Sequence, residues 1–154
     1  MESVLAAALA IIVKELARFE GCKLIAYKDI VGVWTIGYGE TLGVVEGMTW
    51  TQGQADEELR RRALEFLLAV AEYAPNLRNE DARRLAACTL LAYNIGKRGF
   101  KISSVCRHAK AGNWQKAGES FLLWDKAGGK KVRGLSLRRA SESSLFLLLR
   151  VVQV

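Results

Sequence analysis

The sequence is poor in the residues that build metal centres and disulfide frameworks. Of its 154 residues, one is histidine and three are cysteine. Cys22, Cys88 and Cys106 are far apart and form no CxxC pair. A structural zinc site needs four ligands at short spacings, and a disulfide framework needs paired cysteines. We therefore expect no metal centre and no cofactor, with Cys88 in the core and Cys22 packed against its surroundings.

Proline is nearly absent, and no apolar run is long enough to cross a bilayer. The single proline, together with a content of 51% apolar and 25% charged residues, favours a compact and mostly helical protein. The apolar run Val4–Val13 is too short for a transmembrane helix. Glu2 before it and Lys14 after it are unlike the flanks of a secretory signal. Its helical periodicity predicts a core-packing helix over residues 3–19, and the alternative is a segment that inserts into a membrane.

Positive charge is concentrated in the second part of the chain. Residues 1–60 carry five Lys/Arg and nine Asp/Glu, a net charge of −4, whereas residues 61–154 carry eighteen and seven, a net charge of +11. A basic body suggests an anionic partner, such as nucleic acid, a membrane surface or the bacterial cell wall. Ordinary solubilising charge is the alternative.

Strand character is confined to one glycine-rich stretch after the first helix. Leu24, Ala26 and the run Val31–Ile36 predict short strands that turn near Lys28–Asp29. Because this is the only convincing β region, the sequence predicts an α+β architecture with one small sheet.

The remainder of the chain predicts helices. Thr51 followed by Gln54 is a capping-box pattern for a long helix that ends at Pro75. Asn79 is the expected N-cap of the next helix, whose interior over residues 85–93 is apolar on nearly every face and should be buried. Further helices are expected at about 102–111, 113–124 and 135–149, the last packing its apolar end onto the body.

These elements predict a single domain over residues 1–154. Helix 1–19 is expected to pack on a C-terminal lobe, with a sheet lobe at about 20–50 and a mostly helical lobe at about 51–154. The long helix that starts near residue 51 would join the two lobes.

One pattern of carboxylate and hydroxyl residues indicates a candidate catalytic site. Glu20 lies at the end of the first expected helix, and Asp29 and Thr35 follow in the β region. Hydrolysis of a glycosidic bond needs two carboxyl groups on separate supports, one protonated and one ionised. Partial desolvation of Glu20 would favour its protonated form, whereas Asp29 in a polar turn would stay ionised beside a water that Thr35 also binds. The spacing also arises by chance, and many surface carboxylates are solvated and idle.

The stretch from Phe19 to Glu40 resembles the catalytic segment of the phage-type lysozymes, the endolysin family of phage T4 lysozyme. The spacing of Glu20, Asp29 and Thr35 matches the catalytic triad of that family. Nearly the whole chain resembles the family in the same order, through Tyr93-Asn94-Ile95-Gly96, Gly99-Phe100, Ser103-Ser104, Trp124, Ala127-Gly128-Gly129, Gly134-Leu135, Arg138-Arg139 and Glu142.

The resemblance implies a lysozyme-like fold and an endolysin. Such an enzyme hydrolyses the β-1,4 bond between N-acetylmuramic acid and N-acetylglucosamine in bacterial peptidoglycan, mostly with inversion. Glu20 would be the general acid, and Asp29 with Thr35 would position the attacking water. Inversion requires the two carboxyl groups to lie roughly 6.5–9.5 Å apart, so that water fits between them.

The resemblance also implies substrate contacts and a place of action. Tyr93, Asn94 and Ser103 match cleft positions that contact saccharide in the family, and Thr41 would touch substrate from the small lobe. The expected partner is peptidoglycan, with no nucleic acid, no stable membrane insertion and a monomeric protein. The enzyme would be made in the host cytoplasm and reach the cell wall or periplasm after another protein opens the membrane.

Glu40 departs from the family pattern. The family often has a histidine at this position, so its usual histidine–carboxylate contact cannot form here. We expect Glu40 to be solvated and silent, and the alternative is a carboxylate close enough to favour the protonated form of Glu20.

The basic stretch 126–139 holds six Lys/Arg and no acidic residue. Its charge would concentrate the enzyme on the anionic wall, or some of its cations would instead neutralise Glu20 and Asp29 across the cleft. Three other functions remain open on the sequence: a nucleic-acid-binding helical domain, a lytic transglycosylase and a non-catalytic wall-binding module.

Overall fold

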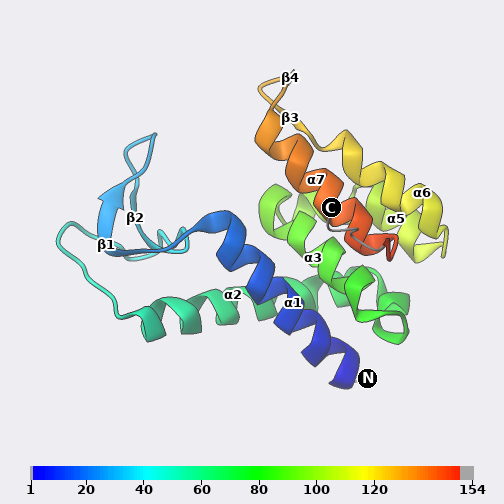
Figure 1. Cartoon of the computed structure of the whole chain (residues 1–154), viewed down its shortest axis with the longest axis horizontal. Helices are drawn as coiled ribbons and strands as arrows, with labels where there is room; N and C mark the ends of the chain where they lie inside the picture. Colours follow the sequence, from blue (N-terminus) through cyan, green and yellow to red (C-terminus); the bar gives the residue numbers. More distant parts are fainter. Residues whose placement is uncertain (1, 150–154) are drawn as a thin grey trace, which may run out of the picture.

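A computed structural model of the chain describes residues 2–149. The elements in chain order are α1 (Glu2–Glu20), β1 (Lys23–Lys28), β2 (Trp34–Gly37), α2 (Gln52–Tyr73), the 3-10 turn η1 (Pro75–Asn79), α3 (Ala82–Ile95), α4 (Lys97–Lys101), α5 (Ser104–Lys110), α6 (Trp114–Ser120), the 3-10 turn η2 (Phe121–Leu123), β3 (Lys126–Ala127), β4 (Lys130–Lys131) and α7 (Arg133–Phe146). The β1–β2 sheet stands apart from the helices α3 to α7, and α1 and α2 run between these two parts (Figure 1). The α+β class expected from the sequence is confirmed.

The first helix packs on the helical body through one face. Ala8, Ile12 and Leu16 recur every four residues and are fully buried, and α1 contacts both α3 and α2. The expected core-packing helix over residues 3–19 is observed over residues 2–20. Among the described residues, no helix combines the length and apolar content that crossing a membrane requires.

The small sheet is a twisted hairpin that the following loop completes. β1 and β2 pair antiparallel, with Tyr27 opposite Thr35. Residues 48–50 also pair with β1 through backbone hydrogen bonds. At the end of β2 the φ angle of Gly37 is +64°, and a Cβ there would lie 2.8 Å from the ring of Trp50. Only glycine fits this position, because both the backbone conformation and the space exclude a side chain.

The long helix α2 begins at the capping box that the sequence predicts. The Gln54 amide donates to Thr51 Oγ1 at 3.1 Å, and the Thr51 amide donates to Gln54 Oε1 at 2.8 Å. Its 22 residues extend roughly 33 Å, enough to reach from the sheet to the helical body. The helix ends at Tyr73, and Pro75 opens the turn η1.

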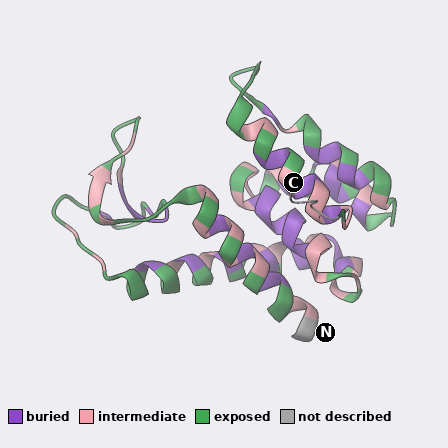
Figure 2. Ribbon diagram, in the orientation of Figure 1, coloured by how far each residue is buried: buried purple, intermediate pink, exposed green. Residues whose placement is uncertain are grey.

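The centre of the core is α3, as its apolar sequence predicts. Every residue from Leu85 to Ala92 is buried, and Cys88 is fully so. The buried faces of α1, α2 and α7 pack around α3 (Figure 2). The expected N-cap at Asn79 is wrong, because Asn79 belongs to η1. Asp81 caps α3 instead, and its Oδ1 accepts from the Arg83 amide at 2.9 Å.

The C-terminal half departs from the predicted boundaries in several places. The short helix α4 was not expected, α5 is shorter than the range 102–111, and η2 replaces the end of the helix expected over 113–124. The glycine-rich turn forms a second antiparallel hairpin, β3–β4, so the prediction of one sheet is wrong. Gly128 and Gly129 both have positive φ angles, which allows this tight turn.

The last helix returns its apolar end to the body. Phe146 is fully buried, and its ring lies 5.4 Å from that of Phe121 between centroids. Leu147 fills the space where a Cβ of Gly118 would lie, so α6 and α7 approach closely only with glycine there. Leu149 is 58% exposed, so the expected packing of residues 145–149 holds for the first part of this run.

Candidate active site

Glu20 is the last residue of α1, where the chain leaves the helical body for the sheet. Its side chain is 28% exposed and is contacted by an arginine of α7. Arg138 Nη1 donates to Glu20 Oε1 at 3.1 Å. The carboxyl group is therefore partly buried, and it is paired with a guanidinium group. The sequence left open that cations of the stretch 126–139 neutralise Glu20 and Asp29; Arg138 contacts Glu20, whereas the contacts of Asp29 are backbone amides.

Arg138 is itself held in a buried cluster. Its guanidinium carbon lies 5.0 Å from the centre of the Phe19 ring, and its Nε donates to Glu142 Oε1 at 3.4 Å. Arg139 Nη2 donates to the same oxygen at 3.0 Å. Burial raises the pKa of Glu142 to about 7, although the two guanidinium groups lower it. Glu20 is thus connected to the core of the helical body through Arg138.

Asp29 and Thr35 are brought together by the backbone of Val33. Asp29 Oδ1 accepts from the amides of Val31 and Val33 at 3.0 and 2.8 Å. The Val33 carbonyl accepts from the Asp29 amide at 2.9 Å and from Thr35 Oγ1 at 2.9 Å. The hydroxyl proton of Thr35 is therefore committed, whereas its lone pairs can still accept a hydrogen bond. Asp29 keeps its second oxygen, Oδ2, for a further contact.

Tyr93 packs against Phe66 and against the guanidinium group that pairs with Glu40. Its ring packs 5.0 Å from that of Phe66, and the guanidinium carbon of Arg62 lies 5.3 Å from its centre. Its hydroxyl is buried and has no hydrogen-bond partner among residues 2–149. Burial raises the pKa of Tyr93 to about 12, and the charges of Arg62, Glu40, Glu20 and Arg138 also act on it. The Tyr93 hydroxyl is therefore protonated at neutral pH.

The other three predicted substrate contacts have different surroundings. Asn94 is exposed, and its Oδ1 accepts from Arg139 Nη1 at 3.0 Å. Ser103 is 4% exposed and caps α5, because its Oγ accepts from the Cys106 amide at 3.1 Å and donates to the Phe100 carbonyl at 2.7 Å. Thr41 is exposed at the edge of a cavity. Saccharide binding by these residues stays a prediction.

Glu40 is buried, so the expectation of a solvated carboxylate is wrong. It is 6% exposed, and its Oε2 accepts from Arg62 Nη1 at 2.9 Å. Burial raises the pKa of Glu40, and the guanidinium group of Arg62 opposes this effect. Glu40 also pairs with Ile36 through the backbone, so the ion pair connects the end of β2 to α2. The sequence does not reveal Arg62 as the partner of Glu40, because no spacing along the chain shows that α2 packs against β2.

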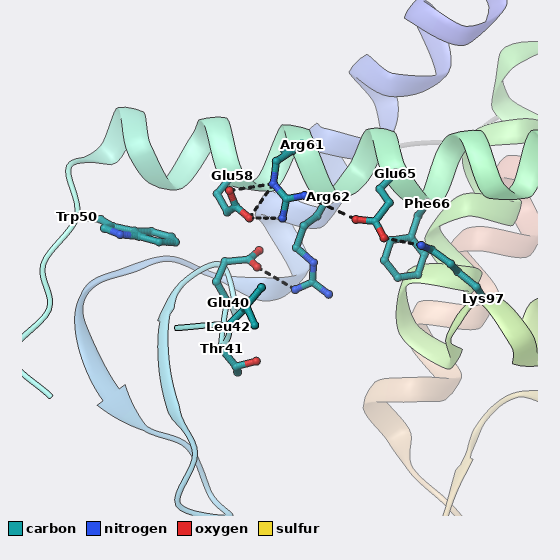
Figure 3. Close-up of a pocket in the computed structure, with 10 residues that line it drawn as sticks. All are labelled: Glu40, Thr41, Leu42, Trp50, Glu58, Arg61, Arg62, Glu65, Phe66 and Lys97. Atoms are coloured by element: carbon teal, nitrogen blue, oxygen red, sulfur yellow. Dashed lines mark hydrogen bonds and ion pairs between the residues drawn. The ribbon is translucent and has the colours of Figure 1, made fainter. Parts of the chain in front are cut away.

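A cavity of about 570 Å³ lies beside this ion pair (Figure 3). Its walls come from residues 40–42, from one face of α2 and from Lys97 of α4. Of the seven predicted site residues, only Thr41 lines it. The cavity is thus a neighbour of the cluster around Tyr93 and distinct from the residues expected to do chemistry.

The described residues contain no group of three His, Cys, Asp or Glu side chains that could hold a metal ion. All three cysteines are free; Cys88 and Cys106 are buried. Cys22 is exposed, so the expectation that it packs against its surroundings is wrong. It follows directly after α1 in the turn at Gly21, where the chain has left the core.

Comparisons with known proteins agree on one family. A family model described as phage lysozyme matches residues 17–142. The chain is 36% identical over 140 residues to the endolysin of Salmonella phage P22, covering 88% of this chain and 94% of that protein. It is 36% identical over 132 residues to the endolysin of Bacillus phage B103, covering 84% of this chain; it spans about half, 49%, of that protein's length.

A solved structure extends this agreement to three dimensions. The muramidase domain of SpmX from Asticaccaulis excentricus is similar with a TM-score of 0.77 and 32% sequence identity. The similarity covers 88% of this chain and 94% of that domain.

Proposed function

The chain belongs to the phage lysozyme family, and we propose that it is an endolysin that hydrolyses the β-1,4 bond between N-acetylmuramic acid and N-acetylglucosamine in bacterial peptidoglycan. The family match covers most of the chain, and the relatives named above exceed 30% identity. The protein is therefore an enzyme of the lysozyme class with a lysozyme-like fold, as the resemblance implied.

The observation that carries the mechanism is the joint support of Asp29 and Thr35 by Val33. The amide of Val33 donates to the carboxylate of Asp29 and its carbonyl accepts from the hydroxyl of Thr35, so both side chains are held by the backbone of one residue. Asp29 Oδ2 would accept one proton of a water molecule, and the lone pairs of Thr35 Oγ1 would accept the other. A water held by two acceptors directs its own lone pair toward the sugar, which is what a general base requires.

Glu20 would be the general acid. In its protonated form it would donate to the glycosidic oxygen as the bond breaks, and the carboxylate left behind would be stabilised by Arg138 at 3.1 Å. Glu20 at the end of α1 and Asp29 after β1 lie on different supports. We propose inversion with a water between them, for which the carboxyl groups must lie roughly 6.5–9.5 Å apart in the substrate complex.

The test compares three conservative variants in a turbidity assay on purified bacterial walls. Glu20→Gln and Asp29→Asn should each lower the lysis rate by roughly 10²- to 10⁴-fold, because each removes one proton-transfer group. Glu72→Gln, an exposed position on α2, serves as the control and should retain full activity. Unchanged lysis by Glu20→Gln would remove this residue from the mechanism.

Product analysis separates the proposal from its rivals. Mass spectra of the released fragments should show reducing muramic acid ends, since water attacks the broken bond. Anhydro-muramic ends would indicate a lytic transglycosylase instead. Binding to walls without release of fragments would indicate a wall-binding module, and salt-dependent DNA retention without lysis would indicate a nucleic-acid-binding domain.

As an endolysin, the protein would act on peptidoglycan as a monomer. It would be made in the host cytoplasm and reach the cell wall or periplasm once the membrane is opened by another protein. Fractionation of expressing cells tests this route against tethering through α1. Recovery of the protein in the membrane fraction would favour the tether.

A further inference from the structure

A cavity of about 480 Å³, distinct from the one beside Glu40, lies where α4 ends and α5 begins. Its volume is within the range of roughly 300–1,000 Å³ that is typical of small-ligand sites. Arg107 and Lys110 are three positions apart on α5 and project from one face of it, and Lys101 reaches the cavity from α4. The lining consists of three cations and three uncharged residues: Lys101, Arg107, Lys110, Ile102, Ser103 and Ala111.

The three cations of this lining have no carboxylate within ion-pair distance among residues 2–149. Lys97, one turn earlier on α4, does pair with Glu65, so a cation of this helix takes a partner where one is in reach. Positive charges gathered around one hollow repel one another, and an anion between them removes this repulsion. The charge of the cavity therefore favours an anionic ligand.

The donors of the cavity are of the kind that recognises phosphate. The Ser103 hydroxyl already donates to the Phe100 carbonyl and accepts from the Cys106 amide, so the charged side chains are left to hold a ligand. Arg107 can donate to two oxygens of one phosphate group at once. Lysine acts as a point charge without a fixed direction, which suits the neighbouring phosphates of a flexible chain. Lys101 Nζ also lies 5.4 Å from the centre of a tyrosine ring, which holds it at the cavity wall.

The cavity is remote from the β1–β2 sheet. Tyr38, the residue after β2, donates to Asp56 near the start of α2, whereas Lys101 lies over Tyr73 at the end of the same helix. The step from residue 56 to residue 73 corresponds to roughly 25 Å of helix. Figure 1 shows α5 and the sheet on opposite sides of the molecule. A ligand in this cavity therefore leaves the sheet free to take part in catalysis.

We propose that this cavity binds the phosphate groups of a phosphodiester-linked polymer attached to the bacterial cell wall. Such a polymer is a flexible chain whose phosphates enter a hollow singly, whereas duplex DNA and a membrane present phosphates on a stiff or flat surface. Ile102, which is 73% exposed, contacts the carbon atoms between successive phosphates. The site goes beyond the proposed function, because it holds the protein on the wall without taking part in the cleavage of glycan.

The binding test uses soluble poly(glycerol phosphate), freed of its lipid anchor, and the whole chain. Arg107→Gln should raise the Kd measured by calorimetric titration roughly three- to tenfold. The slope of log K against the logarithm of the salt concentration should become shallower by about 0.7, the value for the loss of one phosphate contact on a single flexible chain. Lys110→Met provides a second variant of the cavity and should weaken binding in the same way. No binding by wild type, or an unchanged Kd in both variants, overturns the proposal.

Arg98→Gln is the matched control. Arg98 is an exposed arginine of α4 that does not line the cavity. The variant removes the same charge as Arg107→Gln and should leave the Kd unchanged, and thermal unfolding should show that both variants keep the wild-type Tm. Equal weakening by the two variants would mean that the polymer follows the overall positive charge of the protein, which overturns the cavity as its site.

Other polyanions separate a wall polymer from a membrane or nucleic acid. Retention on vesicles of phosphatidylcholine with phosphatidylglycerol, and on a short DNA duplex, should be equal for wild type and Arg107→Gln. A loss of vesicle or DNA binding in Arg107→Gln that exceeds its loss of polymer binding would overturn the assignment to a wall polymer.

Lysis gives a separate readout that rests on the proposed function. Arg107→Gln should lyse walls that carry the polymer more slowly than wild type, and it should match wild type on walls from which the polymer has been stripped. A variant that matches wild type on both walls overturns the site as an anchor. If wild type lyses neither wall, the proposed function fails, whereas the calorimetric result on the polymer still decides the binding site.

Discussion

The side chain of Glu20 is held by an arginine 118 residues later in the chain. Arg138 contacts Glu20, the ring of Phe19 and the buried Glu142 at the same time. Because its guanidinium group is nearly buried and its partners are fixed, the orientation of the Glu20 carboxyl group depends on it. With Glu20 as the proposed general acid, Arg138 would be a positioning residue, since it would act on the substrate through Glu20.

Substitution of Arg138 should lower the catalytic rate by more than any loss of folded protein would account for. Arg138→Gln is expected to reduce kcat by roughly tenfold or more with a smaller change in KM, because the acid loses its orientation while the cleft persists. Arg138→Lys keeps the charge and should recover part of the rate. Steady-state kinetics on soluble glycan chains measures both.

Arg18 offers a matched control for this prediction. It also lies against the Phe19 ring, at 4.9 Å, but its ion pair is with Glu15 on the surface of α1. Arg18→Gln should leave kcat unchanged. A similar loss in both variants would mean that the ring, and not the contact with Glu20, is what matters.

At the scale of elements, one ion pair connects the sheet to the long helix. Glu40 follows β2 and accepts from Arg62 of α2, and Arg62 also lies over Tyr93 of α3. Glu40 is at the position where the resemblance implies a histidine, so in this chain the carboxylate of the ion pair follows β2 and the cation lies on α2.

Removing one side chain of this ion pair should lower the free energy of unfolding more than removing both side chains. Arg62→Met leaves the buried Glu40 uncompensated and is expected to lower the free energy of unfolding by about 2 kcal/mol. The double variant Glu40→Met with Arg62→Met should be closer to wild type, because no buried charge remains. Denaturant unfolding of wild type, Arg62→Met, Glu40→Met and the double variant gives the coupling energy, and additive losses would show that the pair does not join the elements.

At the scale of the whole molecule, α7 closes the helical body over a buried charge cluster. Glu142 is 1% exposed and contacts Arg138 and Arg139, and one turn further along the same helix Phe146 packs on the core. Burial raises the pKa of Glu142 from 4.5 to about 7, so the folded state binds a proton that the unfolded chain has released between these two values.

The stability contributed by Glu142 should therefore fall as pH rises through this window. It is fully present below about pH 4.5, declines between about pH 4.5 and 7, and is lost above the folded pKa. Glu142→Gln imitates the protonated form, so the Tm of the variant relative to wild type should rise with pH over the same range. Thermal unfolding across this range tests the sign, with Glu119→Gln, an exposed glutamate of α6, as control. A constant difference would show that Glu142 keeps an ordinary pKa.

Periodicity and capping patterns were sufficient for much of the fold. The buried faces of α1 and α3, the capping box at Thr51 and the end of α3 at Gly96 all follow from local sequence. Local rules failed where two adjacent turns compete, as at Asn79 and Asp81, and where a hairpin of two-residue strands has no side-chain pattern. The division of the chain into one domain with two lobes stays a prediction.

At the candidate site, the contrast between what local sequence predicts and what tertiary packing sets is clearer still. The sequence by itself determined the family, the α+β class and the candidates Glu20, Asp29 and Thr35, because a motif of 22 residues preserves spacing along the chain. Only the tertiary structure decided which groups surround them: Arg138 against Glu20, Arg62 against Glu40, and Lys97 against Glu65. These partners are 118, 22 and 32 residues apart, and contacts at such distances are set by how helices pack, which local spacing does not encode.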